Sequence, residues 1–178
     1  MNEFGHALRR WRRLRGMKQS HAAELLGITQ ATVSRWELGR HRPTETEARR
    51  LSALLQAPLD SGGDAALRRL VETSALSVHL ICDLSHRLLA ASPPRFVEWH
   101  TSPAELRGMS LWGFATDEIR ASEVKLGDFG WYDDGQSSVR FWTDTNHREV
   151  VHIKPGYLLW ERLQLSDGTL ARLVTSVG

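Results

Sequence analysis

The feature that most constrains this chain is the run from Gln19 to Glu37, in which two short helical patterns meet at a single glycine, Gly27. Each pattern carries small or apolar residues at helical spacing along one side. These are Ala22, Ala23 and Leu26 in the first pattern and Val33 and Trp36 in the second. Residues spaced in this way share one face of a helix and can be buried together. The run therefore predicts two short helices that pack against a common core.

The other side of the second helical pattern is small or hydrogen-bonding. It carries Gln30, Ala31, Thr32, Ser34 and Arg35. Such side chains suit a helix that enters the major groove of DNA, where each base pair presents a distinct pattern of donors and acceptors. The run therefore predicts a DNA-binding helix-turn-helix. The alternative is an ordinary helical hairpin with a solvated polar face.

Residues around this run extend the pattern. They are Leu8-Arg9-Arg10-Trp11-Arg12 ahead of Gly16, Gln19, Ala23, Leu26-Gly27-Ile28, the stretch from Thr32 to Glu37, and Gly39 with Arg42-Pro43. With these residues, positions 4 to 55 resemble the lambda-repressor/Cro family of helix-turn-helix domains, also called the xenobiotic-response-element family. The resemblance covers about a third of the chain and implies a small all-α, five-helix DNA-binding domain.

The resemblance also implies a role for individual side chains. The expected base-reading face consists of Gln30, Ala31 and Arg35, with Thr32 and Ser34 beside them. The residues expected to hold the DNA backbone are Lys18, Gln19, Arg40 and Arg42. Arg12 and Glu37 occupy the positions of a structural ion pair between helices. Lys18 departs from the family, which usually has a Ser or Thr cap there, and loss of that cap should cost about 0.5 to 2 kcal/mol.

Local signals support the same helices independently. Phe4, Leu8, Trp11 and Leu14 give the first helix an apolar stripe that we expect to be buried, and Gly16 can end it in the left-handed conformation. Thr29 is a suitable N-cap for the recognition helix, and Thr44 with Glu47 forms a capping-box pattern that opens a fourth helix. This helix contributes Leu51, Leu54 and Leu55 to the core. The pattern closes near Ala57-Pro58, so we expect a DNA-binding domain over residues 1–59.

Charge divides at the same place. Residues 1–59 hold eleven Lys and Arg against five Asp and Glu, whereas the remainder holds twelve against sixteen. The first region is therefore basic and the second acidic, as expected when only the first meets a polyanion such as double-stranded DNA. No apolar run approaches the length of about 20 residues needed to span a bilayer, and the first residues carry no signal-peptide pattern. We therefore expect a soluble, cytoplasmic protein without membrane partners.

The second region has a different pattern. Residues 60–76 predict a linker, with a joint at Asp60-Ser61-Gly62-Gly63, and a connecting helix from Ala65 to Thr73. In residues 77–178, strands are predicted at 78–83, 88–90, 138–142, 149–153, 157–165 and 170–177, and helices at 94–99, 102–106 and 116–126. Two strands, short helices and a closing antiparallel sheet resemble a PAS domain. The alternative is another α+β domain, including a cupin.

Aromatic residues are frequent in this second region. The expected candidate ligand pocket consists of Trp99, Trp112, Phe114, Trp131, Trp142 and Trp160. An ordinary aromatic core with dimer contacts is the alternative. The chain has one cysteine, Cys82, so it can form neither an internal disulfide nor a cysteine zinc site. Cys82 lies outside any flavin-binding motif, and the 116–126 helix has no histidine for haem. No metal, cofactor or catalytic motif is predicted, so an enzyme is not expected.

These observations predict a sequence-specific DNA-binding transcription regulator, acting as a homodimeric repressor on a palindromic operator. A single helix-turn-helix buries little surface, and pairing two modules on half-sites is the usual way to gain affinity. Residues 77–178 would serve as a PAS-like sensor or dimerisation domain. One alternative is a regulator gated by a small apolar or aromatic effector. Another is an adaptor that binds a second protein.

Overall fold

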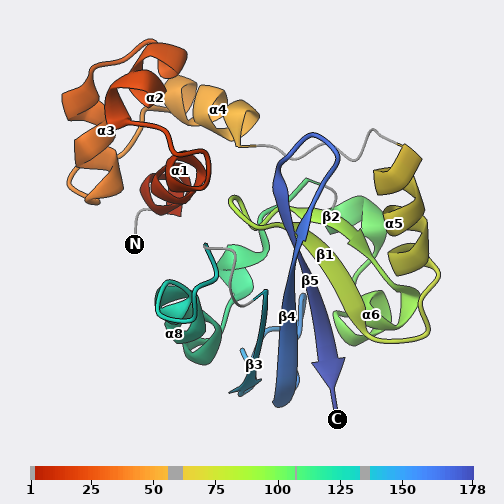
Figure 1. Ribbon diagram of the computed structural model, residues 1–178. Helices are drawn as coiled ribbons and strands as arrows, with labels where there is room; N and C mark the ends of the chain where they lie inside the picture. Colours follow the sequence, from red (N-terminus) through yellow and green to blue (C-terminus); the bar gives the residue numbers. More distant parts are fainter. Residues whose placement is uncertain (1–2, 56–61, 107, 133–136) are drawn as a thin grey trace. The chain divides into compact units, whose positions relative to one another are not determined.

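The computed structural model describes residues 3–55, 62–106, 108–132 and 137–178. The chain divides into two compact units, Met1–Gln56 and Ala57–Gly178. The first unit is helical (Figure 1), and its described helices are α1 (Glu3–Leu14), α2 (Gln19–Leu26), α3 (Gln30–Glu37) and α4 (Glu45–Leu54). The predicted closing residues, Ala57-Pro58, lie outside the described residues.

The caps of the first unit explain where its helices begin and end. Gly16 and Gly27 follow α1 and α2 with φ of 58° and 67°, a left-handed conformation that glycine adopts without steric cost. Thr29 caps α3 by accepting from the backbone N–H of Thr32. Thr44 and Glu47 form a complete capping box at α4. The boundaries of these helices thus follow from local residue chemistry.

The core of the first unit joins all four helices. Its buried apolar side chains are Ala7, Leu8, Trp11, Ala22, Ala23, Leu26, Val33, Trp36, Leu51 and Leu55. The expectation that Phe4 is buried is wrong, because its side chain is 37% exposed in the first turn of α1.

The second unit is built around a five-stranded antiparallel sheet in the order β2-β1-β5-β4-β3. Its strands are β1 (Val78–Cys82), β2 (Leu88–Ala91), β3 (Ser138–Thr143), β4 (Gly156–Gln164) and β5 (Leu170–Val177). Its helices are α5 (Gly62–Glu72), α6 (Pro93–Glu98), α7 (Pro103–Leu106), the 3₁₀ helix η1 (Leu111–Phe114) and α8 (Asp117–Lys125). The expected order, a helical region followed by an α+β domain with an antiparallel sheet, is confirmed.

Alternation along the strands separates two faces of this sheet. One face carries Ile81, Leu158, Trp160 and Val174 into the core, where Trp99, Leu106, Leu126 and Trp131 join them. α6 packs on β1 and α8 packs on β3, whereas α5 packs on β1 and β2 (Figure 1). Residues of β1 that alternate with Ile81, such as Leu80 and Cys82, are buried as well. β1 is therefore enclosed on both faces.

Two expectations for this unit are wrong. Residues 149–153 form no strand. Their backbone is held instead by the Asn146 side chain, which donates to the Val151 carbonyl at 2.9 Å and accepts from the Ile153 N–H at 3.0 Å. Val151 has a φ of 55°, which a strand does not allow. Gly62 and Gly63 belong to the first turn of α5 rather than to a flexible joint. Asp60 and Ser61 lie outside the described residues.

Candidate nucleic-acid interface and central cavity

Helix α3, which is expected to read bases, is buried on one side and exposed on the other. Val33, Trp36 and Glu37 are 0%, 1% and 4% exposed. The side chains expected to read bases are exposed at Gln30, Ala31 and Arg35 and half-buried at Thr32 and Ser34. α3 thus presents a face of small or hydrogen-bonding side chains while its apolar stripe holds it on the core.

The hydroxyl groups at the start of α3 already make hydrogen bonds within the protein. The Oγ1 atoms of Thr29 and Thr32 lie 2.9 Å apart in a hydrogen bond, and Thr29 Oγ1 also accepts from the Thr32 N–H at 3.2 Å. Thr32 therefore helps to fix the N-terminus of the helix. Gln30 and Arg35 are left as the long polar side chains of the exposed face.

A buried carboxylate joins three helices behind that face. Arg12 of α1 forms a two-pronged ion pair with Glu37 of α3, in which Nε donates to Oε1 at 2.9 Å and Nη2 donates to Oε2 at 3.0 Å. Arg12 Nη1 also donates to the Met17 carbonyl at 2.8 Å. The hydrogen bond to Glu37 raises the pKa of the Arg12 guanidinium. The pair expected between helices is therefore present in the structure, with planar fork geometry.

Gln19 completes this network. Its side-chain Nε2 donates to Glu37 Oε2 at 2.9 Å. A phosphate contact from the same amide group, which the sequence resemblance implied, would compete with this bond. The structure thus gives Gln19 a role in positioning α2 against α3, which sequence spacing did not reveal.

The expected backbone-binding cations lie at the surface. Lys18, Arg40 and Arg42 are exposed. Lys18 occupies the N-cap of α2 and makes no side-chain capping bond, so its ammonium group takes no part in capping that helix. Arg40 and Arg42 follow the end of α3. Cations beside a recognition helix suit contact with phosphates, which sets register without reading sequence.

The second unit contains a cavity of about 80 Å³ between the core face of its sheet and its helical cover. The cover is contributed by α6, η1, α8 and the segment around Val151, and the sheet by β1, β4 and β5. Of the six aromatic residues expected to form a ligand pocket, four line this cavity: Trp99, Trp112, Phe114 and Trp160.

The two other aromatic residues correct that expectation. Trp131 is fully buried beside the cavity rather than in its lining, because its Nε1 donates to Asp83 at 3.2 Å and its ring lies against Arg172. Trp142 points away from the core face and is 51% exposed, with its ring edge-to-face against Tyr157 at 5.2 Å between centroids. Sequence alone could not distinguish these environments, because strand pairing decides which face each residue occupies.

Two histidines line the cavity. His79 of β1 is 9% exposed and packs edge-on against Trp99 at 4.8 Å between centroids. His86, in the turn between β1 and β2, is 7% exposed and stacks on Trp112 at 4.6 Å. Among the described residues, His79 Nδ1 and both ring nitrogens of His86 are buried with no hydrogen-bond partner. Burial, followed by the charge of Arg95, lowers the pKa of His79 well below 6.5.

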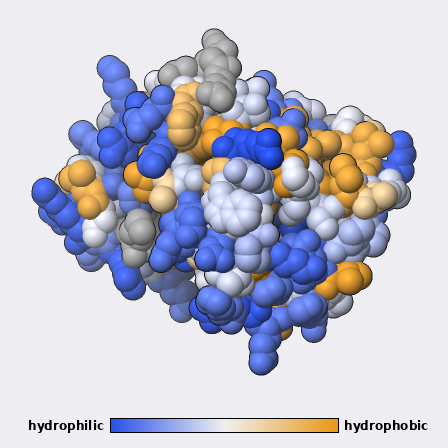
Figure 2. Space-filling model, turned by 90° about the horizontal axis from the view of Figure 1, so that it is seen from below, coloured by the Kyte–Doolittle hydropathy of each residue, from blue (hydrophilic) through white to orange (hydrophobic). Residues whose placement is uncertain are grey.

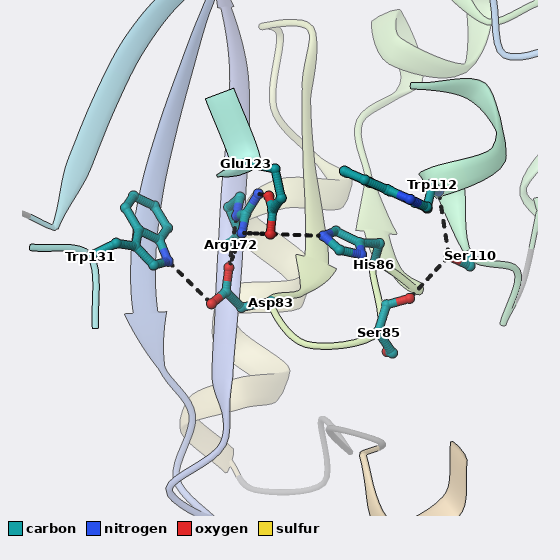
Figure 3. A network of polar contacts seen from close by, with 8 residues as sticks. All are labelled: Asp83, Ser85, His86, Ser110, Trp112, Glu123, Trp131 and Arg172. Carbon is teal, nitrogen blue, oxygen red and sulfur yellow. Dashed lines mark hydrogen bonds and ion pairs between the residues drawn. The ribbon is translucent and has the colours of Figure 1, made fainter. Parts of the chain in front are cut away.

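A buried ion cluster lies next to His86 (Figure 3), and its arginine, Arg172, lines the cavity. Arg172 of β5 is 1% exposed, and its Nε donates to Asp83 Oδ1 at 2.7 Å while its Nη1 donates to Glu123 Oε2 at 2.6 Å. Its guanidinium carbon lies 4.3 Å from the centroid of the Trp160 ring. His86 Nε2 is 3.4 Å from Glu123 Oε1. Sequence reasoning missed this cluster, because its members come from the turn after β1, from α8 and from β5.

A second buried arginine lies at the other end of β1. Arg95 of α6 is 3% exposed and donates to Glu98 at 2.9 Å, to the Ser77 carbonyl at 2.6 Å and to the Ser176 hydroxyl at 3.0 Å. Burial is the main cause that lowers the pKa of Arg95, and Glu98 opposes it. Arg95 thus ties α6 to the sheet.

The described residues contain no group of His, Cys, Asp and Glu arranged to hold a metal ion. None of the helices in that part of the chain has the length and apolar character to cross a membrane.

Residues 8–61 match the protein family described as Helix-turn-helix. The first unit is a helix-turn-helix domain. The match covers less than half of the chain, and it includes the recognition helix with both ends of its supporting network, Arg12 and Glu37. The narrower resemblance to xenobiotic-response-element members stays a prediction. No curated protein matches the sequence.

Several solved structures are similar in fold. The RsLOV d2 variant aligns with a TM-score of 0.51 at 15% identity, over 66% of this chain and 67% of its own. A PAS domain of an HTR-like protein from Haloarcula marismortui aligns with a TM-score of 0.47 at 16% identity, over 75% of this chain and 98% of its own. An RNA-binding light-oxygen-voltage receptor aligns with a TM-score of 0.46 at 11% identity, over 98% of this chain and 58% of its own. The likeness to the RsLOV d2 variant shows similarity of fold alone.

Proposed function

We propose that this protein is a sequence-specific DNA-binding transcription regulator that acts as a homodimeric repressor. The observation that carries the proposal is the recognition helix of the helix-turn-helix domain. Its buried side is fixed by Val33, Trp36 and Glu37, while Gln30 and Arg35 extend from its exposed side. Gln can pair with adenine and Arg with guanine through two hydrogen bonds each, and each such contact is worth about 1 to 3 kcal/mol of discrimination.

The surrounding charged side chains fit separate roles in phosphate contact and in positioning the helices. Lys18, Arg40 and Arg42 are exposed cations near the ends of α2 and α3, which suits contact with phosphates. Arg12 is bound by Glu37 and acts in positioning α1 against α3. Gln30, Ala31 and Arg35 would read bases, with Ser34 beside them and Thr32 holding the helix N-terminus.

The exposed face of the sheet supports a homodimer. Trp142 and Tyr157 are 51% and 42% exposed and lie side by side on β3 and β4. Leu159 and Leu173 alternate with core residues on β4 and β5 and are half-buried. Figure 2 shows orange, hydrophobic residues scattered among hydrophilic ones on the face of the molecule that it presents. Covering an apolar sheet face with a second copy would bring two recognition helices to one operator.

The experiment that tests base reading is DNA selection from a random library with the full chain. We expect a palindromic motif, and we expect the double variant Gln30→Ala and Arg35→Ala to lose preference for it while its folded-state circular dichroism is unchanged. Arg49→Ala is the matched control, because Arg49 is also exposed but lies on α4 in an ion pair with Glu45. An unchanged motif with the double variant would show that α3 does not read the bases.

Phosphate contact is tested separately by the salt dependence of binding. We expect Arg42→Ala to weaken binding to all sequences about equally and to lower the slope of log K against log salt by about one. A loss confined to one operator would assign base reading to Arg42. Repression is tested with a reporter gene that has the selected motif overlapping its promoter, where we expect expression to rise when the protein is deleted.

The dimer is tested by sedimentation equilibrium. We expect Trp142→Ser with Tyr157→Ser to shift the full chain toward the monomer and to weaken binding to a palindrome more than to a half-site. Val124→Ser is the control, because Val124 is 76% exposed on α8. A dimer that persists in the double variant would place the interface elsewhere.

A further inference from the structure

His86 is held in a strained position in the turn between β1 and β2. Its φ is 55°, a left-handed conformation that costs energy for residues other than glycine. Two backbone hydrogen bonds of 2.9 Å keep it there, from the His86 N–H to the Cys82 carbonyl and from the Leu111 N–H to the His86 carbonyl. The turn thus presents a nearly buried imidazole in one fixed direction.

This imidazole contacts two elements of the helical cover (Figure 3). Its ring stacks on Trp112 of η1, with 4.6 Å between centroids and 23° between planes. Its Nε2 lies 3.4 Å from Oε1 of Glu123 on α8, which is longer than a well-formed hydrogen bond. His86 therefore joins the turn, η1 and α8 through contacts that a change in the ring can tighten.

A proton on His86 would strengthen both contacts. Imidazolium carries an N–H on each ring nitrogen, so Nε2 would donate to the Glu123 carboxylate in a charge-assisted bond of roughly 2.7 to 2.9 Å. A positive ring over the indole of Trp112 would gain a cation–π attraction as well. Imidazole is the side chain whose charge ordinarily changes between pH 5 and 8.

The charges of the neighbouring ion cluster favour that proton. Among the titratable groups drawn in Figure 3, Asp83 and Glu123 are acidic and Arg172 is basic. Their formal charges sum to −1 while His86 is neutral and to zero when it is protonated. Glu123 has an oxygen turned toward each cation, since Oε2 accepts from Arg172 at 2.6 Å whereas Oε1 is the atom nearest to His86.

Two other arginines are close to the same contacts. Arg87 follows His86 in the turn, and its guanidinium donates to the Gly108 carbonyl. Arg120 of α8 lies 4.9 Å from the centroid of the Trp112 ring and donates to the Trp112 carbonyl. Their positive charges oppose a proton on His86, so the contact with Glu123 has to outweigh them.

The charged groups elsewhere in the cavity lining do not share this arrangement. Arg95 is paired with Glu98, and Lys154 is exposed, where water screens its charge. Burial, followed by the charge of Arg95, lowers the pKa of His79 well below 6.5. His79 therefore stays neutral under mildly acidic conditions, and the carboxylate of Glu123 distinguishes His86 from it.

We propose that His86 is a proton-operated latch, which ties α8 and η1 to the turn between β1 and β2 when its ring is protonated and releases α8 when its ring is neutral. The latch goes beyond DNA recognition and does not depend on it, because all of its residues belong to the second unit. α8 is the element that responds, because it has no fully buried residue of its own.

The experiment follows the full chain by NMR from pH 8 to pH 5. The ¹⁵N signals of the histidine rings report which of them is protonated, and the hydrogen-exchange protection of the α8 amides reports how often that helix opens. Protection is expressed relative to the amides of β5, which removes effects of pH on exchange chemistry and on global stability. We expect the relative protection of α8 to be about tenfold higher when His86 is protonated, as a charge-assisted hydrogen bond allows.

Two variants assign the effect to the latch. His86→Asn keeps a residue that tolerates the left-handed backbone, and Glu123→Gln keeps the shape of the partner without its charge. Each should make the relative protection of α8 independent of pH. His147→Asn is the matched control, because His147 has a φ of 51° but is exposed, and it should leave the pH dependence intact.

Three results would overturn the proposal. The first is a His86 ring that stays neutral down to pH 5. The second is unchanged relative protection of α8 while the His86 ring titrates. The third is a pH dependence that persists in His86→Asn. If a variant fails to fold, the ring signals and the protection in the unsubstituted chain decide. DNA selection is a separate assay, so failure of this proposal and failure of the proposed function are distinguishable.

Discussion

Replacing Arg172 by methionine should greatly reduce the free energy of unfolding of the second unit. Arg172 is 1% exposed, and the two carboxylates that it holds belong to Asp83, which is fully buried, and Glu123, whose side chain is 11% exposed. Methionine has a similar length but supplies no charge. The substitution would leave two carboxylates in the core with no cation between them.

The expected cost is about 3 to 5 kcal/mol, which is typical when one partner of a buried ion pair is removed and the other stays charged. The upper part of this range is favoured, because two carboxylates lose their partner and the guanidinium also gives up its position over the Trp160 ring, 4.3 Å away. Domains are stabilised by only about 5 to 15 kcal/mol. The variant should therefore be marginal at 37 °C.

The assay is urea unfolding followed by tryptophan fluorescence, with a control that separates lost charge from lost packing. Arg172→Met combined with Asp83→Asn and Glu123→Gln removes the unpaired charges, so most of the lost stability should return. In the single variant the buried carboxylates would have a raised pKa. They would take up protons on folding, so the deficit should shrink as the pH falls from 7 toward 5. A loss below about 1 kcal/mol, or no recovery in the triple variant, would refute the view that Arg172 acts by compensating buried charge.

Three smaller effects follow from the same structure. His79 has a pKa well below 6.5 in the folded protein, so below about pH 6.5 its side chain gains a proton only in the unfolded state. The free energy of unfolding should therefore fall by about 1.4 kcal/mol for each pH unit below that point. Urea titrations at several pH values should show this pH dependence, and His79→Phe should remove it. Glu37→Ala should cost the first unit about 2 to 3 kcal/mol, because Glu37 is 4% exposed and its loss leaves Arg12 without its partner; Glu45→Ala, in an exposed pair, should change thermal unfolding by less than about 0.5 kcal/mol. Gly27→Ala should cost about 1 kcal/mol by differential scanning calorimetry, because φ is 67° while the space for a methyl group is open; no change in its unfolding temperature would contradict this reasoning.

Sequence reasoning succeeded where neighbouring residues decide the outcome. The caps at Thr29 and Thr44 and the turn at Gly27 each depend on residues within about four positions, and the structure has them as expected. The ion pair of Arg12 and Glu37 is long-range, and only the family resemblance indicated it. Apolar periodicity alone would have placed Phe4 in the core, but the first turn of a helix has too little structure around it to bury such a ring.

Sequence reasoning failed where strand pairing or a distant side chain decides. Residues 149–153 have the composition of a strand, yet Asn146 takes the hydrogen bonds that a neighbouring strand would have provided. Trp142 and Trp160 are both tryptophans within predicted strands, so the sequence does not distinguish them. The register of β3 against β4 places Trp142 on the outer face of the sheet and Trp160 in the cavity lining. Arg172 within a strand pattern gives no sign of burial, because its two carboxylate partners are 89 and 49 residues away.

Helix α8, in the cover of the cavity, is attached to the rest of the second unit largely by polar contacts. α8 has no fully buried residue along its length, and Ile119 is partly buried against the core. Its attachments are polar: Glu123 binds Arg172, Arg120 donates to the Trp112 carbonyl at 2.9 Å, and Thr116, at its N-cap, bonds to Thr143 at 2.7 Å. An element with few apolar contacts opens at a lower free energy than the sheet that it covers.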